Sequence, residues 1–252
     1  MKTHSAIFIP VRLASTRLPE KALSSIHGKP ILEHLVDRSR LSTQADRVVI
    51  CTTCEPYDDP LEELCARSGV DIFRGSNEDL LQRFLDAAHH YGVTHILNID
   101  GDDVMMDPNQ VDEVAVAIKD PDWDYVRMSG MPFGANPLAL TVDALERVCA
   151  EKSSSDTATG WGVYFESSDA FRRKTITVTD ADLMRPDIRV TLDYPEDLEF
   201  ITAIYDALYR EGEPVRIRDV VELLNEQPDL LEINAGLEGK YWKHVSENQT
   251  GA

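Results

Sequence analysis

Apolar runs of strand length alternate with helix-like segments through the first 120 residues of the chain. The strands expected from this pattern span residues 5–10, 47–52, 70–73 and 95–99. The helices expected between and after them span residues 30–38, 61–68, 77–91 and 108–119. Such alternation is typical of a parallel sheet that is covered by helices on both faces, so the pattern predicts an α/β fold.

The second half of the chain is less regular. Its expected strands span residues 124–128, 138–141, 175–178 and 188–192, and its expected helices span residues 142–151, 195–209 and 218–225. The segment 152–160 is rich in Ser, Thr and Asp and is predicted to be a loop. Because no internal repeat or linker interrupts the chain, we expect one domain over residues 1–240 and a polar tail over residues 240–252.

The composition excludes several classes of protein. The net charge of −20 argues against binding to nucleic acid or to an anionic membrane surface. No apolar run reaches the roughly 18 residues of a transmembrane helix, and the apolar N-terminal run is too short for a signal peptide. Four cysteines do not suggest a disulfide scaffold, and we interpret the pair Cys51 and Cys54 as ordinary thiols at a strand end. We expect a cytoplasmic protein.

Positive charge gathers in the loop that follows the first predicted strand. The first 40 residues contain seven Lys or Arg and three Asp or Glu, a balance of +4, so the other 212 residues carry −24. Arg12, Arg17 and Lys21 lie in the loop with the hydroxyl groups of Ser15 and Thr16. The glycine patterns of dinucleotide-binding and Walker A loops are missing. Cations at the carboxyl end of a first strand predict a polyphosphate site.

Carboxylates follow two other predicted strands. Asp100, Asp102 and Asp103 come directly after the strand at residues 95–99, and Asp193 ends the strand at residues 188–192. Paired carboxylates at this edge of a parallel sheet can hold Mg²⁺ against substrate phosphates. An acidic turn is the alternative for the first group, and a helix N-cap that also faces the crevice is a second role for Asp193.

These motifs together resemble a known family. The segment from Arg12 to Lys21, with Gly28-Lys29-Pro30, closely resembles the opening of the cytidylyltransferases that activate acidic sugars, such as CMP-Kdo and CMP-sialate synthetases. Further motifs are most similar to the spore-coat polysaccharide branch: Asp58-Asp-Pro60, Phe73-Arg-Gly75-Ser76 with Asp79, Gly101-Asp102, Asp107-Pro108 and residues 192–198. The similarity covers roughly residues 5–120 and 186–205.

The resemblance implies a Rossmann-like nucleotidyltransferase fold of the GT-A-like kind, with a mostly parallel sheet and helices on both faces. Residues 1–120 would form the nucleotide-binding half, and residues 121–215 would form the acceptor and dimerisation half of a homodimer. The implied reaction is the Mg²⁺-dependent transfer of CMP from CTP to an acidic sugar or a related acceptor, with release of pyrophosphate.

The resemblance also implies roles for individual residues. Arg12, Arg17 and Lys21 would hold the triphosphate and act in catalysis, while Asp102 and Asp193 would bind Mg²⁺. The remaining nucleotide contacts would come from residues at the ends of strands and in the following loops: Pro10, Arg12, Ser15, Thr52, Gly75, Ser76, Asp79 and Asp100.

The chain departs from the family pattern in the predicted acceptor half. Apolar Ala139 and Leu140 stand where members of the branch often carry carboxylates, so we expect an unusual acceptor. We interpret Trp161, Tyr164 and Phe165 as core residues rather than an acceptor pocket. Other functions stay open: a guanylyltransferase acting on a sugar 1-phosphate, a GT-A glycosyltransferase that uses Asp100-Gly-Asp102, and a nucleotide-binding module without catalytic activity.

Overall fold

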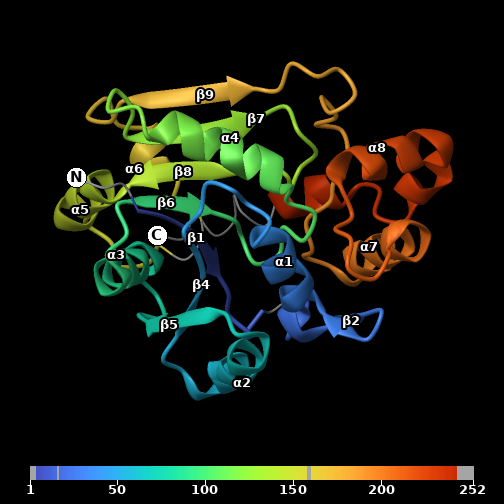
Figure 1. Cartoon of the computed structure of the whole chain (residues 1–252), viewed down its shortest axis with the longest axis horizontal. Helices are drawn as coiled ribbons and strands as arrows, with labels where there is room; N and C mark the ends of the chain where they lie inside the picture. The colour runs from blue at the N-terminus through green and yellow to red at the C-terminus, as the bar shows by residue number, and fades with distance from the viewer. Residues whose placement is uncertain (1–3, 16, 158–159, 243–252) are drawn as a thin grey trace.

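The computed structural model describes residues 4–15, 17–157 and 160–242. Thr16 and most of the predicted polar tail lie outside these residues. A seven-stranded sheet with the order β5-β4-β1-β6-β8-β7-β9 forms the centre of the molecule (Figure 1). Its strands, in chain order, are β1 (Ser5–Pro10), β4 (Arg47–Thr53), β5 (Asp71–Gly75), β6 (His95–Asn98), β7 (Tyr125–Ser129), β8 (Leu138–Thr141) and β9 (Arg173–Thr177).

The first half of the chain forms the parallel part of the sheet. β1 pairs in parallel with β4 on one side and with β6 on the other, and β4 pairs in parallel with β5. The connecting helices are α1 (Ile31–Ser39), α2 (Asp59–Ser68), α3 (Leu80–Tyr91) and α4 (Pro108–Ile118). Gly69 and Gly92 adopt left-handed backbone conformations that end α2 and α3. The predicted α/β fold is therefore confirmed, and helix α3 begins three residues later than predicted because Asp79 caps it.

The second half adds an antiparallel strand to the sheet. β8 runs antiparallel to both β6 and β7, whereas β9 is parallel to β7 and lies at the edge. The strand predicted at residues 188–192 is wrong. This segment makes only an isolated bridge between Arg189 and Phe133 and a further hydrogen bond to Asp102, because it crosses the end of the sheet instead of running beside a strand.

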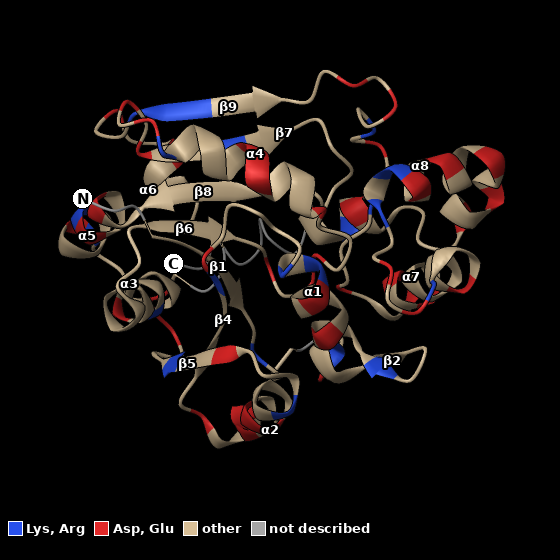
Figure 2. Cartoon of the chain, viewed as in Figure 1, with Lys and Arg blue, Asp and Glu red and all other residues tan. Residues whose placement is uncertain are grey.

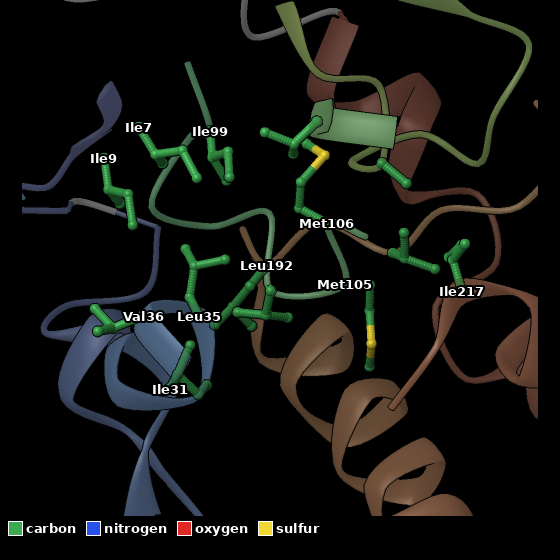
Figure 3. Packing of buried hydrophobic residues seen from close by; sticks show 14 of the residues in the cluster. Ile7, Ile9, Ile31, Leu35, Val36, Ile99, Met105, Met106, Leu192 and Ile217 are labelled. Carbon is green, nitrogen blue, oxygen red and sulfur yellow. The ribbon is translucent and has the colours of Figure 1, made fainter. Parts of the chain in front are cut away.

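Helices pack on both faces of the sheet. Alternate residues of β1 supply the two cores, with Ile7 and Ile9 on one face and Ala6 and Phe8 on the other. Figure 3 shows Ile7 and Ile9 on the face that also receives Ile31 and Leu35 of α1. Helices α1, α2 and α4 cover this face, and α3 covers the other with α5 (Val142–Glu151) and α6 (Val163–Glu166).

Two further helices pack beside the core. α7 (Pro195–Leu208) and α8 (Ile217–Glu226) lie together at one side of the molecule (Figure 1) and extend the first core through residues such as Phe200 and Val220. Short elements complete the fold: β2 (Ser25–Ile26), β3 (Lys29–Pro30), and the 3-10 turns η1 (Lys21–Leu23), η2 (Pro56–Asp58) and η3 (Pro228–Glu232).

The surface of the helices carries most of the charge, and the two cysteines after β4 differ in exposure. Charged side chains gather on the outer faces of the helices, whereas β6 and β8 carry none (Figure 2). Among the described helices, none has the length and apolar character needed to cross a membrane. Cys51 is buried and Cys54 is exposed, and both are free thiols.

Candidate active site

A pocket of about 830 Å³ opens at the carboxyl ends of β1, β6 and β7. Its wall combines the loop after β1, the acidic loop after β6, the segment that crosses the end of the sheet, and the last described helical turn. Most of the site residues predicted from the sequence line this one pocket: Pro10, Arg12, Ser15, Arg17, Lys21, Asp100, Asp102 and Asp193. The parallel order of β1 and β6 explains this convergence, because neighbouring parallel strands end at the same edge of the sheet.

Gly101 allows the acidic loop to pack closely against the end of β1. A Cβ atom at this position would lie 2.7 Å from the carbonyl oxygen of Pro10 and 2.8 Å from a methyl carbon of Val11. Only glycine fits this contact without a shift of the backbone. The close packing places Asp100 and Asp102 directly beside the cationic loop.

Lys21 lies between the two carboxylates that the sequence pointed to as metal ligands. Its Nζ atom is 2.7 Å from Asp102 Oδ2 and 3.2 Å from Asp193 Oδ1, and it also donates to the carbonyl oxygen of Leu192 at 2.7 Å. Burial alone would lower the pKa of Lys21, but the two carboxylates outweigh burial and raise it. Lys21 is therefore held as an ammonium ion that neutralises both carboxylates.

Asp193 accepts hydrogen bonds from two arginines as well. Arg17 Nη2 lies 2.5 Å from Oδ1, and Arg189 Nη2 lies 2.9 Å from Oδ2. Burial would raise the pKa of Asp193, but Lys21 and the two guanidinium groups together lower it. Both oxygens are thus occupied, so the predicted N-cap role of Asp193 is wrong. Tyr194 holds the N-cap position of α7, and Asp197 accepts from the backbone N–H groups of Asp193 and Tyr194.

The acidic loop brings three carboxylates to one point. One oxygen from each of Asp100, Asp102 and Asp103 lies within 4.8 Å of the others. Asp100 is open to the pocket by its surface area, yet the protein atoms around it, followed by the charge of Asp102, raise its pKa to about 6. Burial and the charge of Asp102 also raise the pKa of Asp103 well above its ordinary value. The three carboxylates therefore repel one another, and the neighbouring cations do not fully offset this repulsion.

The remaining predicted nucleotide contacts lie away from the pocket wall. Thr52 is buried and donates to Asp58 Oδ2 at 3.1 Å. Asp79 caps α3 by accepting a hydrogen bond from Gln82 N. Its carboxylate also accepts a hydrogen bond from Lys152 Nζ and, at 3.0 Å, one from the hydroxyl of Thr157. Ser76 Oγ accepts from Asp79 N at 3.0 Å, and Gly75 packs against the stem of Arg83. These contacts are structural, and the assignment of the four residues to the base and ribose stays a prediction.

Several pocket residues escaped the sequence analysis. Arg189, which lies behind the pocket wall, pairs with both Asp193 and Asp197, and its spacing of four and eight residues from them was the signal that was missed. Tyr241 lines the pocket, and its ring centroid lies 5.8 Å from the guanidinium carbon of Arg17 and 5.4 Å from that of Arg189. In the sequence it lies in a polar segment, which gave no sign of this position. Trp161 is buried as predicted for a core residue, and it also lines the pocket.

Phe165 and Tyr164, the other two aromatic residues predicted to lie in the core, differ in how deeply they are buried. Phe165 is fully buried in the second core, where it stacks on Tyr125 at a centroid distance of 5.3 Å. Tyr164 is only half-buried and packs against the edge of the same core. The aromatic segment therefore belongs mainly to the core, with Trp161 reaching the pocket.

A doubly covered, mostly parallel sheet with cations after its first strand and carboxylates after a central one defines a nucleotidyltransferase. The chain belongs to the cytidylyltransferase family, whose model matches residues 6–229. It is therefore an enzyme of the nucleotidyltransferase class, as the sequence motifs indicated.

Similar proteins agree with this assignment. The chain is 31% identical over 232 residues to the spore coat polysaccharide biosynthesis protein SpsF of Bacillus subtilis, a match that covers 88% of this chain and 94% of that protein. It is 35% identical over 114 residues to 3-deoxy-manno-octulosonate cytidylyltransferase of Aeromonas salmonicida, which covers 43% of this chain and 44% of that enzyme. A solved cytidylyltransferase structure from Leptospira borgpetersenii has a TM-score of 0.85 at 24% identity, over 91% of this chain and 97% of that chain.

Proposed function

We propose that the chain transfers CMP from CTP to an acidic sugar and releases pyrophosphate in a Mg²⁺-dependent reaction. One observation carries this proposal: the Lys21 ammonium group lies between Asp102 and Asp193, with Arg17 on the same carboxylate. In the free site, the charges of Lys21 and Arg17 are paired with those of Asp102 and Asp193. A triphosphate would pair with the cations of the site, and a divalent cation would pair with its carboxylates. Together the two ligands can therefore replace the internal ion pairs.

The donor set fits a hard divalent cation. Carboxylate oxygens are the ligands that Mg²⁺ prefers, and a positive group already lies between Asp102 and Asp193 in the form of Lys21. Asp102 also belongs to the cluster with Asp100 and Asp103. In this proposal Asp102 and Asp193 hold Mg²⁺, which supplies charge neutralisation at the phosphates when it is bound.

The cationic loop provides the other half of the site. Arg12, Arg17 and Lys21 would hold the triphosphate, since arginine grips phosphate oxygens in a bidentate manner and lysine acts as a point charge. A hydroxyl oxygen of the acceptor attacks the α-phosphorus, and a new P–O bond forms as the bond to the bridging oxygen of the β-phosphate breaks. Pyrophosphate leaves with that oxygen, and the hydroxyl proton passes to solvent. Lys21 stabilises the negative charge that develops on the leaving group.

An acidic sugar is the acceptor that the family resemblance supports, because the Aeromonas salmonicida relative is named for 3-deoxy-manno-octulosonate. The acceptor would lie near the end of β7, where Ser129, Gly130 and Asn136 line the pocket. The resemblance also supports a homodimer, which sedimentation velocity would test.

Pyrophosphate release is the direct test. The enzyme would be assayed with CTP, GTP, UTP or ATP and Mg²⁺, against a panel of acidic sugars and sugar 1-phosphates. Release with CTP and an acidic sugar supports the proposal. Release with GTP and a sugar 1-phosphate would replace it by a guanylyltransferase. Sugar transfer from a nucleotide sugar without pyrophosphate would indicate a glycosyltransferase, and nucleotide binding without any turnover would indicate a binding module.

A further inference from the structure

The last described helical turn, residues 237–242, lies beyond the region that the family model matches. That match ends at residue 229. The turn nevertheless brings Tyr241 into the wall of the pocket, where Arg17 and Asp193 also lie. The phosphate side of the pocket therefore includes a segment that the family pattern does not account for.

Asn234 ties this segment to the ionic pair of Arg189 and Asp197. Its side-chain nitrogen donates to the carbonyl oxygen of Arg189 at 3.2 Å and to Asp197 Oδ1 at 3.1 Å. Asn234 and Leu237 are both buried. Tyr241 follows Leu237 by one helical turn, so the two side chains lie on the same side of the turn. The anchored segment thereby presents Tyr241 to the pocket.

The ring of Tyr241 lies against two guanidinium groups. The guanidinium carbon of Arg17 is 5.8 Å from the ring centroid of Tyr241 and 5.8 Å from that of Tyr194. The guanidinium carbon of Arg189 is 5.4 Å from the centroid of Tyr241 and 5.3 Å from that of Phe133. Aromatic faces attract cations at such distances. The four aromatic and cationic side chains around Tyr241 thus form one cation–π cluster.

The cluster compensates for donors that find no oxygen. Arg17 Nε and Arg189 Nη1 are buried, and neither has a hydrogen-bond partner among the described residues. In the free site Arg17 pairs through Nη2 with Asp193. A ring contact, unlike a contact with an oxygen acceptor, need not occupy an N–H donor. Tyr241 can therefore hold Arg17 while the donors of the guanidinium group turn from a carboxylate to a phosphate.

We propose that Tyr241 is a positioning residue whose ring holds the Arg17 guanidinium group at the triphosphate subsite. The inference rests on the proposed function, which assigns Arg17 to the triphosphate. A side chain that is already held in place loses less conformational freedom when the ligand binds, so the ligand binds more tightly. Without the Tyr241 ring, Arg17 keeps only the ring of Tyr194 and the ion pair with Asp193, and the triphosphate competes for that ion pair.

The test separates the ring from the hydroxyl group and from the fold. Tyr241→Leu removes the aromatic face, and Tyr241→Phe keeps it. Both would be compared with Arg17→Met and with the double variant Arg17→Met, Tyr241→Leu. Tyr91→Leu is the matched control, because Tyr91 lies 4.7 Å from the guanidinium carbon of Arg47, which begins β4 at the opposite edge of the sheet.

The probe is inorganic tripolyphosphate with Mg²⁺, which carries no base. Calorimetry on the full chain would measure its affinity, and the kcat and KM for CTP would be measured in parallel. Tyr241→Leu should weaken tripolyphosphate binding and raise KM by about 5-fold, the scale of a partly buried cation–π contact, with a smaller change in kcat. Tyr241→Phe should stay within about 2-fold of wild type, and Tyr91→Leu should leave the affinity unchanged.

The double variant shows whether Tyr241 acts through Arg17. In the Arg17→Met background, Tyr241→Leu should have no further effect, whereas a merely structural role would weaken binding equally in both backgrounds. An equal loss in the two backgrounds overturns the inference. So does a loss in Tyr241→Phe as large as that in Tyr241→Leu, or an affinity that Arg17→Met leaves unchanged.

The inference and the proposed function can fail separately. The inference alone fails when an enzyme that releases pyrophosphate from CTP loses affinity in Arg17→Met but not in Tyr241→Leu. The expected pattern in an enzyme that releases pyrophosphate only from GTP would support the role of Tyr241 and replace the proposed function by a guanylyltransferase.

Discussion

Asp193 illustrates how one carboxylate can organise a site. Its two oxygens accept from Arg17, Lys21 and Arg189, which come from the first loop and from the segment before α7. Arg189 in turn binds both oxygens of Asp197, which is completely buried. A buried ionic network of this kind, in which each charged group has at least one partner of opposite charge, restricts the positions of its members. Arg17 and Lys21, two of the cations that we assign to the triphosphate, therefore lie at the pocket before any ligand arrives.

Removal of the Asp102 carboxylate should affect turnover and spare the fold. We expect Asp102→Asn to lower kcat by about 100-fold or more, the scale seen when one electrostatic contact to a transition state is lost. The melting temperature should change little, because the lost ion pair with Lys21 is offset by the lost repulsion of Asp100 and Asp103. Pyrophosphate release and thermal melts would measure both, with the exposed Asp169→Asn as control. A variant with near-normal rates at limiting Mg²⁺ would remove Asp102 from the metal site.

Lys21→Ala should lower turnover and leave the base preference unchanged. Without the ammonium group the triphosphate loses a point charge, so we expect kcat to fall by about 100-fold or more. The preference for CTP over UTP should not change, since Lys21 contacts Asp102 and Asp193, which we assign to the metal. Steady-state kinetics with both nucleotides would measure this. An altered base preference at a normal rate would contradict the role assigned to Lys21.

At the scale of elements, the entry to β7 depends on a carboxylate clamp. Asp124 precedes the strand and accepts from the backbone N–H and the guanidinium group of Arg172, which precedes β9. Arg147 of α5 also lies 3.2 Å from the same carboxylate. The clamp therefore joins β7, β9 and α5 at one corner of the sheet. The contact with Arg172, opposed by partial burial, lowers the pKa of Asp124 to about 2.

Asp124→Asn should destabilise the protein at neutral pH and not in acid. The pKa of Asp124 is lower in the folded state than its ordinary value of 3.8. Its ionised carboxylate therefore contributes fully to the free energy of unfolding above pH 3.8, and this contribution is lost as the pH falls from there towards 2. We expect a loss of about 1 kcal/mol at pH 7, a value reduced for the exposure of Arg172. Urea unfolding at pH 7 and pH 3 would show the difference from wild type narrowing, with Asp122→Asn as control. An equal difference at both pH values would contradict the clamp.

The elements differ in how far the sequence predicts them. The parallel half is predictable because β1, β4 and β6 each contain a continuous apolar run and because Gly69 or Gly92 marks a helix end. Residues 188–192 have the composition of a strand, yet they form only an isolated bridge and do not pair along a neighbouring strand. No local sequence pattern reveals where a segment lies relative to the edge of the sheet. Composition determines that a segment is buried, and topology determines what it pairs with.

The same distinction applies to the site. The cationic loop and the Asp-Gly-Asp turn were predictable because strand ends of a parallel sheet meet at one edge. The assignment of Asp79 to the nucleotide stays a prediction, and the sequence did not reveal that its carboxylate also caps α3 and binds Thr157, a residue far along the chain. Tyr241 was missed because a lone aromatic residue in a helical segment is ordinary in sequence. Its position at the pocket depends on long-range packing.

At the scale of the whole molecule, Gly134 joins the two halves of the pocket wall. Its backbone has a φ of +97°, and a Cβ atom there would lie 2.6 Å from the backbone nitrogen of Thr191. Phe133 exchanges backbone hydrogen bonds with Ile188 and Val190 beside this contact. The loop after β7 is therefore fastened to the segment that carries Asp193, and the predicted acceptor side is fixed relative to the nucleotide side.

Gly134→Ala should loosen this junction. We expect a loss of about 2 kcal/mol or more in the free energy of unfolding, because the methyl group adds a clash with backbone to the strain of a positive φ. Gly92→Ala is the matched control: its φ is +65°, but nothing lies within 4 Å of the added atom, so it should cost only about 1–2 kcal/mol. Urea titration of both variants would measure the two effects. Equal losses would mean that the contact with Thr191 contributes nothing.

The position of Lys21 between Asp102 and Asp193 has a thermodynamic consequence for occupancy of the pocket. An anion that attracts Lys21 away removes the cation that Asp102 and Asp193 share, and thereby raises the affinity of these carboxylates for a divalent ion. Linkage requires the converse to hold by the same factor, so a divalent ion that engages the carboxylates frees Lys21 for the anion. Nucleotide and metal should consequently bind with positive cooperativity, and a protein that holds either ligand weakly alone can hold the pair tightly.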